Sequence, residues 1–161
     1  MKILIVVRHA KAVWADLEIK DHQRALDPQG IADAAKLGQF LLQEGIRPDL
    51  VLSSTALRAV TTAGIIVNNM NLLPSIIKQK DVLYNASAET ILSVVHSIPP
   101  SKNVVMLVGH NPGVSDFVSL MTEESPFNMG TCDVAIVGLE CDSWANCQPG
   151  TAFLSRYIEN Y

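Results

Sequence analysis

The opening stretch of the chain, MKILIVVRHA, constrains the fold more than any other part of the sequence. Residues 3–7 form an uncharged apolar run that is rich in β-branched side chains. Such a run is typical of a strand buried on both faces of a parallel sheet. It stops at Arg8 and His9, an anion-binding guanidinium and an imidazole. Because ligands bind at the carboxyl ends of strands in open α/β sheets, the sequence places a candidate site here.

Two later stretches repeat this pattern of a buried strand followed by polar residues. Residues 49–53 predict one strand, and a helix carrying Arg58 in its first turn follows it. Residues 104–109 predict another strand, which is followed directly by His110 and Asn111. Parallel strands joined by right-handed helical crossovers have their carboxyl ends at one edge of the sheet. We therefore expect the three strand ends to meet.

Helical patterns separate these strands. Asp27 followed by Pro28 predicts a helix start with the aspartate as N-cap, and Gly45 fits the turn that ends this helix. A second helix is expected after the second strand, with Ser54 or Thr55 as its cap. The alternation of strands and helices predicts an α/β fold, and it favours a parallel sheet.

The second half of the chain extends this pattern. Ser87 is expected to cap a third helix, whereas residues 68–85 predict no more than a short strand near residues 76–77. Residues 134–139 and 152–158 predict an antiparallel C-terminal hairpin on the sheet. The expected architecture is a three-layer α/β/α sandwich with a mostly parallel central sheet and an antiparallel C-terminal strand.

Composition excludes several classes of protein. The chain has 161 residues, which fits a single domain spanning 1–161, and its net charge of −4 argues against nucleic acid as a partner. No apolar run is long enough for a secretory core or a membrane span. Three cysteines, Cys132, Cys141 and Cys147, lack tight metal-ligand spacing. We interpret them as reduced thiols of a cytoplasmic protein; the alternative is one disulfide in the C-terminal hairpin.

Converging arginines predict the chemistry of the candidate site. Arg8, Arg58 and Arg24 can meet at the shared edge of the sheet together with the imidazoles of His9 and His110. Guanidinium groups bind phosphate oxygens through bidentate, charge-assisted hydrogen bonds. A histidine or arginine at one strand end is a weak signal, but their shared position predicts a phosphate site.

The same residues carry a resemblance to a known family. The chain resembles the histidine phosphatase superfamily, which is also called phosphoglycerate mutase-like. The family's strand followed by Arg-His-Gly or Arg-His-Ala corresponds to VVRHA here. Its Ser-x-x-x-Arg-Ala-x-x-Thr-Ala pattern corresponds to STALRAVTTA, which contains Arg58, and its Gly-His-Asn corresponds to GHNPG, which contains His110.

Within this superfamily the chain is most similar to the SixA-like phosphohistidine phosphatases. The short length and the stretch DHQRALDPQG carry this similarity, and Arg24 resembles the additional phosphate-binding arginine of that branch. Larger members of the superfamily insert a cap after the second helix. This chain leaves no room for one, so the resemblance implies an open site without a large cap domain.

The resemblance implies a mechanism in which His9 is the nucleophile and becomes transiently phosphorylated. Its catalytic group comprises His9, Arg8, Arg58 and His110, and its substrate-binding group comprises Arg8, Arg24, Arg58, His110 and Asn111. Neighbouring arginines should lower the pKa of His9 and keep one ring nitrogen nucleophilic. The arginines supply the positive charge, so no metal and no cofactor are expected.

One departure from the superfamily concerns the proton donor. Many members place a glutamate after the second helix, where this chain reads KDVLYNASAE. Asp81 and Glu89 are the nearby carboxylates, but neither matches the family pattern, and Glu89 also fits the first turn of a helix. Because imidazole leaves readily once protonated, a missing acid favours a phosphohistidine substrate over a phosphate ester.

These observations predict a phosphohistidine phosphatase acting on a signalling or phosphotransfer protein. The substrate would be a histidine-containing phosphotransfer domain or a phosphotransferase-system protein, with phosphate bound at the site and no membrane partner. Two alternatives stay open at this point. One is a general small-molecule phosphomonoesterase of the same superfamily, with Asp81 or Glu89 as acid. The other is a non-catalytic module that binds phosphoproteins, for which His9 would be unnecessary.

Overall fold

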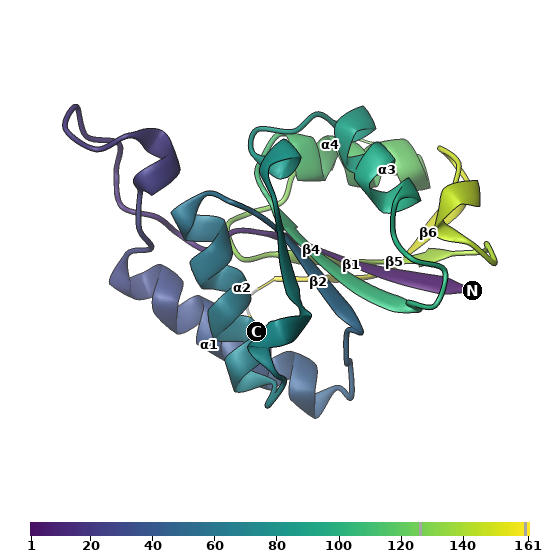
Figure 1. Ribbon diagram of the computed structural model, residues 1–161, viewed down its shortest axis with the longest axis horizontal. Helices are drawn as coiled ribbons and strands as arrows, with labels where there is room; N and C mark the ends of the chain where they lie inside the picture. Colours follow the sequence, from purple (N-terminus) through teal and green to yellow (C-terminus); the bar gives the residue numbers. More distant parts are fainter. Residues whose placement is uncertain (126, 160) are drawn as a thin grey trace.

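The computed structural model describes residues 1–125, 127–159 and 161. Within these ranges the chain forms a six-stranded sheet with the order β3-β2-β4-β1-β5-β6. The strands are β1 (Lys2–Arg8), β2 (Leu50–Ser54), β3 (Ile77–Lys80), β4 (Val104–Gly109), β5 (Val134–Leu139) and β6 (Ala152–Ile158). Figure 1 shows the sheet running through the middle of the molecule, with helices above and below it.

The sheet is mostly parallel. β1 pairs in parallel with β4, β4 with β2, and β2 with β3. β5 runs antiparallel both to β1 and to β6. The last strand is therefore antiparallel to its neighbour, and the predicted mixed sheet is confirmed.

Two helices cover each face of the sheet. α1 (Pro28–Gln43) and α2 (Leu57–Asn69) pack on one face, and α3 (Ala88–His96) and α4 (Gly113–Thr122) pack on the other. The alternation of side chains along β1 explains both cores, because Leu4 and Val6 face α3 and α4 whereas Ile5 and Val7 face α1 and α2. The three-layer α/β/α sandwich is confirmed.

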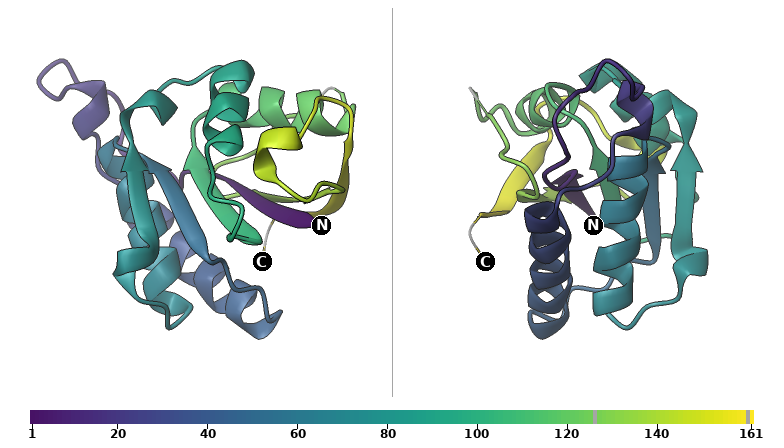
Figure 2. Two further views of the ribbon diagram at one scale, coloured as in Figure 1. Left: turned by 45° about the vertical axis from the view of Figure 1, so that its right-hand side comes forward. Right: turned by 90° about the vertical axis from the view of Figure 1, so that its left-hand side faces the viewer.

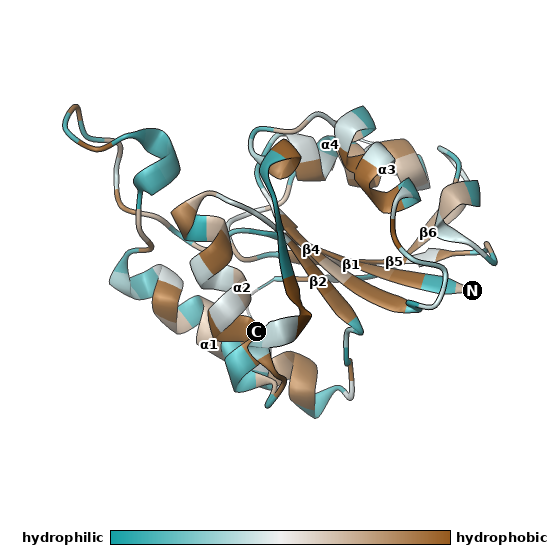
Figure 3. Cartoon of the chain, viewed as in Figure 1, coloured by the Kyte–Doolittle hydropathy of each residue, from teal (hydrophilic) through white to brown (hydrophobic). Residues whose placement is uncertain are grey.

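Burial on both faces explains the uninterrupted apolar run at the start of the chain. Residues 4–7 of β1 have no exposed surface, and Figure 3 shows the central strands as the most hydrophobic part of the chain. Between α2 and β4 the chain contains only β3, α3 and the 3₁₀ turns η2 (Pro74–Ile76) and η3 (Asp81–Leu83). A cap domain is therefore absent from this described stretch.

Helix starts follow the predicted caps in two places and depart from them in a third. Asp27 accepts a hydrogen bond from the Gly30 backbone N–H at 2.7 Å, and Ser87 caps α3. The prediction that Ser54 or Thr55 caps α2 is wrong, because the N-cap is Ala56 and no side chain caps this helix. The Ser54 hydroxyl instead contacts the ring of His110 at 2.8 Å.

Residues 11–27, here called the arm, connect β1 to α1. The arm contains the 3₁₀ turn η1 (Asp21–Gln23), and an isolated β-bridge between Ala12 and Leu26 joins its two ends. Its outer part projects beyond the sheet and the helices, as the purple segment in Figures 1 and 2 shows. The arm thus leaves the carboxyl end of β1, where the candidate site was predicted.

Two further features concern the whole chain. Within the described ranges, none of the helices has the length and apolar character that crossing a bilayer requires. All three cysteines are free, and the Sγ atoms of Cys141 and Cys147 lie 2.9 Å apart in the connection between β5 and β6.

Candidate active site

The carboxyl edge of the sheet brings four of the predicted residues together. Arg8 ends β1, His9 follows it, Arg58 lies in the first turn of α2, and His110 follows β4. The ring centroids of His9 and His110 are 5.1 Å apart, and Arg58 Nε donates to His9 Nε2 at 3.4 Å. Residues that are far apart in the sequence therefore form one cluster, as the strand ends predicted.

The ring of His9 is held in one orientation. Its Nδ1 lies 2.7 Å from the carbonyl oxygen of Ala10, so Nδ1 carries the proton and donates it. Nε2 is then unprotonated and faces Arg58. Thr62 stabilises this arrangement, because its hydroxyl accepts from the Ala10 N–H at 3.0 Å and donates to the Arg58 carbonyl at 2.7 Å.

Electrostatics also favour a neutral His9. Burial lowers the pKa of His9 to about 4, with the positive charges of Arg58, Arg8 and Arg24 acting in the same direction and the Ala10 carbonyl opposing them. The neutral ring with an unprotonated Nε2 is the nucleophilic form of histidine. The environment thus keeps His9 ready to attack an electrophile at neutral pH.

His110 lies beside His9 and is neutral as well. Its Nε2 contacts the Ser54 hydroxyl at 2.8 Å, and burial together with His9 and Arg58 lowers the pKa of His110 to about 3. Its Nδ1 is buried and has no hydrogen-bond partner. With Nε2 accepting from the Ser54 hydroxyl, Nδ1 carries the ring proton and is an unused donor.

Arg8 supplies a second unused donor. Its Nη1 donates to the Met129 carbonyl at 2.9 Å, while its buried Nε has no partner, and burial lowers the pKa of Arg8. Among the described residues, Arg8 Nε and His110 Nδ1 are the buried side-chain nitrogen or oxygen atoms without a partner. Buried polar groups are nearly always paired, so two such atoms in one cluster indicate the place of a polar ligand.

Asn111 hydrogen-bonds to the backbone and side chains next to this cluster. Its side-chain N–H groups donate to the Met129 carbonyl at 2.9 Å and to Asn128 Oδ1 at 3.2 Å, and its Oδ1 accepts from Ser115 at 2.7 Å. The Met129 carbonyl is therefore shared by Asn111 and Arg8. Through this shared carbonyl Asn111 is linked to Arg8, and its predicted contact with a substrate stays a prediction.

The arm brings an unpredicted carboxylate, Asp21, to the arginines. Arg58 donates through Nη1 to the Asp21 carbonyl at 2.8 Å and through Nη2 to the carboxylate at 3.1 Å. Arg24 Nε and the Tyr84 hydroxyl donate to the same carboxylate at 2.9 and 2.5 Å. The Tyr84 hydrogen bond, helped by both arginines, holds the pKa of the Asp21 carboxyl well below its usual range.

Sequence reasoning missed Asp21 and Tyr84 for different reasons. Asp21 precedes Arg24 by three residues in a loop, and this spacing is a usable signal for an ion pair within one turn. Tyr84 has no such signal, because it reaches Asp21 from a segment 63 residues away. Its ring also packs edge-on against His110, with centroids 5.6 Å apart. Arg24 was predicted to contact phosphate, and the structure places it on Asp21 beside Arg58.

The two predicted proton donors do not join the cluster. Asp81 begins η3 and is exposed, and Glu89 is exposed in the first turn of α3. Among the described residues, neither carboxylate has a hydrogen bond or an ion pair to Arg8, Arg58, His9 or His110. The structure places both side chains in solvent at their own helix starts, outside the arginine–histidine cluster.

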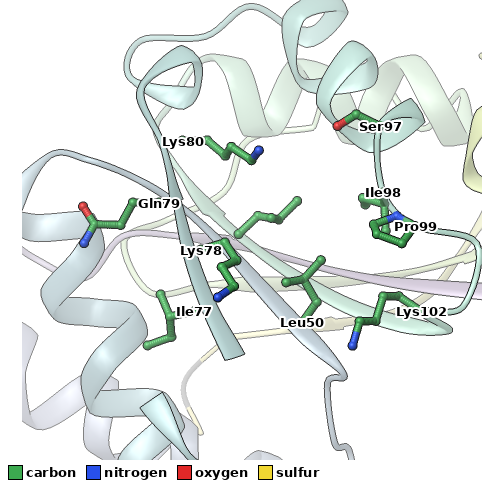
Figure 4. A pocket seen from close by; sticks show the side chains of 10 residues that line it. Leu50, Ile77, Lys78, Gln79, Lys80, Ser97, Ile98, Pro99 and Lys102 are labelled. Carbon is green, nitrogen blue, oxygen red and sulfur yellow. The ribbon is translucent and has the colours of Figure 1, made fainter. Parts of the chain in front are cut away.

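Two other kinds of candidate site are relevant among the described residues, a metal site and a surface cavity. The described residues include no group of three or more histidine, cysteine or acidic side chains that could hold a metal ion. A cavity of about 640 Å³ lies between β3, β2 and the end of α3, where Lys78, Lys80 and Lys102 surround an apolar floor (Figure 4). Its lining contains none of the predicted site residues. The arginine–histidine cluster is therefore the candidate active site.

Comparisons with known proteins point to one family. Residues 4–81 match the family model of the histidine phosphatase superfamily (branch 1). An uncharacterised chloroplastic protein of Arabidopsis thaliana is 32% identical over 150 residues, covering 88% of this chain and 68% of that protein. An uncharacterised protein of Mycobacterium tuberculosis is 27% identical over 158 residues, covering 92% of this chain and 96% of that protein.

Solved structures give the same result for the fold. A protein assigned as the phosphohistidine phosphatase SixA from Agrobacterium tumefaciens superposes with a TM-score of 0.85 and 29% identity, covering 99% of this chain and 98% of that one. The protein histidine phosphatase SixA complexed with tungstate superposes with a TM-score of 0.83 and 20% identity, covering 97% and 96% of the two chains. The similarity therefore extends over nearly the whole chain.

Proposed function

The chain belongs to the histidine phosphatase superfamily and is a phosphatase of that family, and from this premise we propose that it removes phosphate from phosphohistidine on a phosphotransfer protein. The observation that carries the proposal is the neutral His9 beside two buried, unpartnered nitrogen atoms, Arg8 Nε and His110 Nδ1. A phosphoryl group offers several oxygen acceptors to such donors. The substrate protein would be a histidine-containing phosphotransfer domain or a phosphotransferase-system protein.

His9 Nε2 is the proposed nucleophile. It attacks phosphorus in line, and the new P–N bond forms as the P–N bond to the substrate imidazole breaks. The departing imidazole takes a proton from solvent. Water then attacks the phosphorus on His9, which releases phosphate and restores the free ring. The Ala10 carbonyl keeps the proton on Nδ1 throughout, so Nε2 is available in each cycle.

Positive charge and oriented donors stabilise the transferring phosphoryl group in this mechanism. Arg8, Arg58 and His110 would bind its equatorial oxygens, with Arg24 acting from the arm. Positioning and electrostatic stabilisation account for most of the catalysis in phosphoryl transfer. Because guanidinium groups supply the charge, we propose that the reaction needs no metal ion.

The carboxylate in the site supports phosphohistidine as the substrate. Asp21 is ionised, since Tyr84 and two arginines hold its pKa well below the usual range, and it has no proton to give to a leaving group. An alkoxide leaving group depends on such a proton, whereas imidazole is protonated readily by solvent. A site without a protonated carboxyl therefore favours P–N over P–O cleavage.

Two structural neighbours support the same substrate class. The Agrobacterium tumefaciens protein is assigned as a phosphohistidine phosphatase, and the more distant SixA structure holds tungstate, a phosphate-like oxyanion. We extend the phosphohistidine activity and the anion-binding role to Arg8, Arg58, His9 and His110 of this chain as part of the proposal.

Substrate preference tests the proposal directly. Phosphate release is measured from a phosphotransfer domain phosphorylated on histidine and from p-nitrophenyl phosphate, each with and without a metal chelator. We expect a higher kcat/KM on phosphohistidine and no effect of the chelator. Faster ester cleavage would indicate a small-molecule phosphomonoesterase instead. A stable complex without phosphate release would indicate a binding module, and loss of activity with chelator would contradict metal independence.

The pKa of His9 gives a prediction for the pH dependence. Because this pKa is lowered to about 4, the nucleophilic form persists well below pH 6.5 and is lost only as the pH falls through about 4. We expect kcat/KM on an acid-stable phosphate ester to show its acid limb near pH 4. Circular dichroism over the same range controls for unfolding. An acid limb at the ordinary histidine pKa, with the fold intact, would contradict this assignment.

A further inference from the structure

Exposed apolar side chains occur on the segments that begin at the carboxyl edge of the sheet, where the candidate active site lies. Nine large apolar side chains of the described residues are exposed. Five of them lie on segments that leave the carboxyl ends of parallel strands. These five, here called the apolar rim, are Trp14, Leu17 and Ile19 in the arm after β1, Leu57 after β2, and Val82 after β3.

The arm carries the most exposed part of this rim. Trp14 is 90% exposed and Leu17 is fully exposed, and the arm projects beyond the rest of the molecule (Figures 1 and 2). Scattered apolar residues are normal on protein surfaces, but a tryptophan and a leucine three residues apart on one projecting loop are not scattered. Tryptophan is also enriched among the residues that contribute most to protein–protein binding.

Each segment that carries a rim residue also carries a residue of the active site or a direct partner of one. The arm is joined to Arg58 through Asp21, whose carboxylate lies 3.1 Å from Arg58 Nη2. Leu57 directly precedes Arg58 in α2. Val82 lies two residues before Tyr84, whose hydroxyl donates to Asp21 at 2.5 Å. The rim residues therefore lie on the three segments that also supply contacts of the active site.

We propose that the apolar rim is the docking surface for the protein that presents the phosphohistidine, an inference that rests on the proposed function. The fitting partner is a folded protein that presents its phosphohistidine together with an apolar surface. Rim side chains come from three separate segments, so a free phosphorylated amino acid bound at His9 cannot contact them together. A protein surface, which buries about 800 Å² on each side in a typical complex, can do so.

Charge in the arm favours a protein over a membrane or a nucleic acid. Lys11 and Lys20 are exposed together with Asp16 and Glu18, so the two signs are mixed along the arm. A polyanionic surface would need a cluster of basic side chains. Burial of the rim, rather than net charge, is then the main source of affinity for the partner.

The test compares two substrates that share their chemistry but differ in size. One is a phosphotransfer domain phosphorylated on histidine, and the other is free phosphohistidine. The double variant Trp14→Ser/Leu17→Ser removes the outer rim. Leu73→Ser is the matched control, because Leu73 is 73% exposed but lies between α2 and β3, at the opposite edge of the sheet.

Docking through the rim predicts a selective loss. The double variant should lose about tenfold or more in kcat/KM on the phosphorylated domain, mainly through KM, while its rate on free phosphohistidine stays at the wild-type value. The Leu73→Ser control should match wild type on both substrates. An unchanged rate on the phosphorylated domain would overturn the inference, and so would an equal loss on both substrates, which would assign the arm to shaping the site.

Two other outcomes separate this inference from the function it rests on. If wild type hydrolyses phosphohistidine in both forms and the double variant does too, the docking surface is wrong but the proposed function stands. If wild type hydrolyses neither form, the proposed function fails and the inference fails with it. Analytical ultracentrifugation of wild type and the double variant tests whether the rim instead binds a second copy of this chain. A wild-type dimer that the double variant converts to a monomer, with both rates unchanged, would overturn the inference.

Discussion

Replacing His9 with alanine is expected to lower phosphate release from phosphohistidine by roughly 10⁴-fold or more. The variant loses Nε2, the atom that Arg58 Nε approaches at 3.4 Å and that the Ala10 contact leaves unprotonated. No other described side chain offers a neutral imidazole in that position, since His110 Nε2 is engaged with Ser54. Initial rates of phosphate release at saturating substrate measure the effect.

A second histidine provides the control for this prediction. His96 lies at the end of α3, where its Nε2 contacts the Cys147 carbonyl at 2.8 Å. His96→Ala removes an imidazole that has no contact with the active-site cluster, so its rate should stay within a few-fold of wild type. Circular dichroism checks that both variants fold. A folded His9→Ala variant that keeps more than about one hundredth of the wild-type rate would contradict the role of His9.

Replacing Arg58 with lysine is expected to cost about 10²- to 10³-fold in kcat even though the positive charge is kept. The guanidinium makes three contacts at once, two through Nη1 and Nη2 to Asp21 and one through Nε to His9. An ammonium group cannot reproduce this planar fork. The phosphoryl group would lose an oriented donor, and Asp21 would lose the partner that holds the arm in place.

Arg47→Lys is the matched control for Arg58→Lys. Arg47 is exposed in the connection between α1 and β2, before the amino end of β2 and therefore at the opposite edge of the sheet from the cluster. We expect this control to match wild type in kcat and KM. Both constants are measured on free phosphohistidine, so that docking of a protein substrate does not contribute. Wild-type kcat in the Arg58→Lys variant would show that charge alone is sufficient and that the fork is not used.

Local sequence signals predicted most of the fold because the relevant physics is local. The apolar run in β1 is buried on both faces, and Asp27 and Ser87 cap the helices that directly follow them. Ser54 is a residue whose contacts could not be predicted from the local sequence. Its hydroxyl could have capped α2, but it contacts His110, which is 56 residues away in the sequence. The hydroxyl accepts from the local Ala56 N–H at 3.2 Å and also contacts His110, and the sequence pattern carries no information about this tertiary partner.

In the candidate site, too, some features follow from the sequence and others depend on tertiary contacts. Arg8, His9, Arg58 and His110 could be placed together because each follows the carboxyl end of a parallel strand, and topology alone brings such ends to one edge. The contacts of Asp21 with Arg58 and Tyr84 could not be predicted, because they depend on how the arm folds back and on a distant segment. The positions of Asp81 and Glu89 depend on tertiary structure in the same way, since both carboxylates are near Tyr84 in sequence but exposed in space.

The arm is a long connection between β1 and α1. Residues 11–27 are polar and irregular in sequence, and their only regular element is a single 3₁₀ turn. Such loops are rare in compact domains unless they serve a function. Here one connection supplies both a carboxylate for the active-site arginines and the most exposed apolar side chains of the described residues, to which we assign partner docking as a proposal.

The most direct test of the central claim is to trap phosphate on the enzyme. A phosphotransfer domain carrying labelled phosphohistidine is mixed with wild-type enzyme, the reaction is stopped in alkaline denaturant, and the labelled peptide is identified by mass spectrometry. The account predicts transient label on the peptide containing His9, formed and lost at the rate of turnover and absent from His9→Ala. Label on another residue, or full-rate phosphate release with no label on His9, would contradict it.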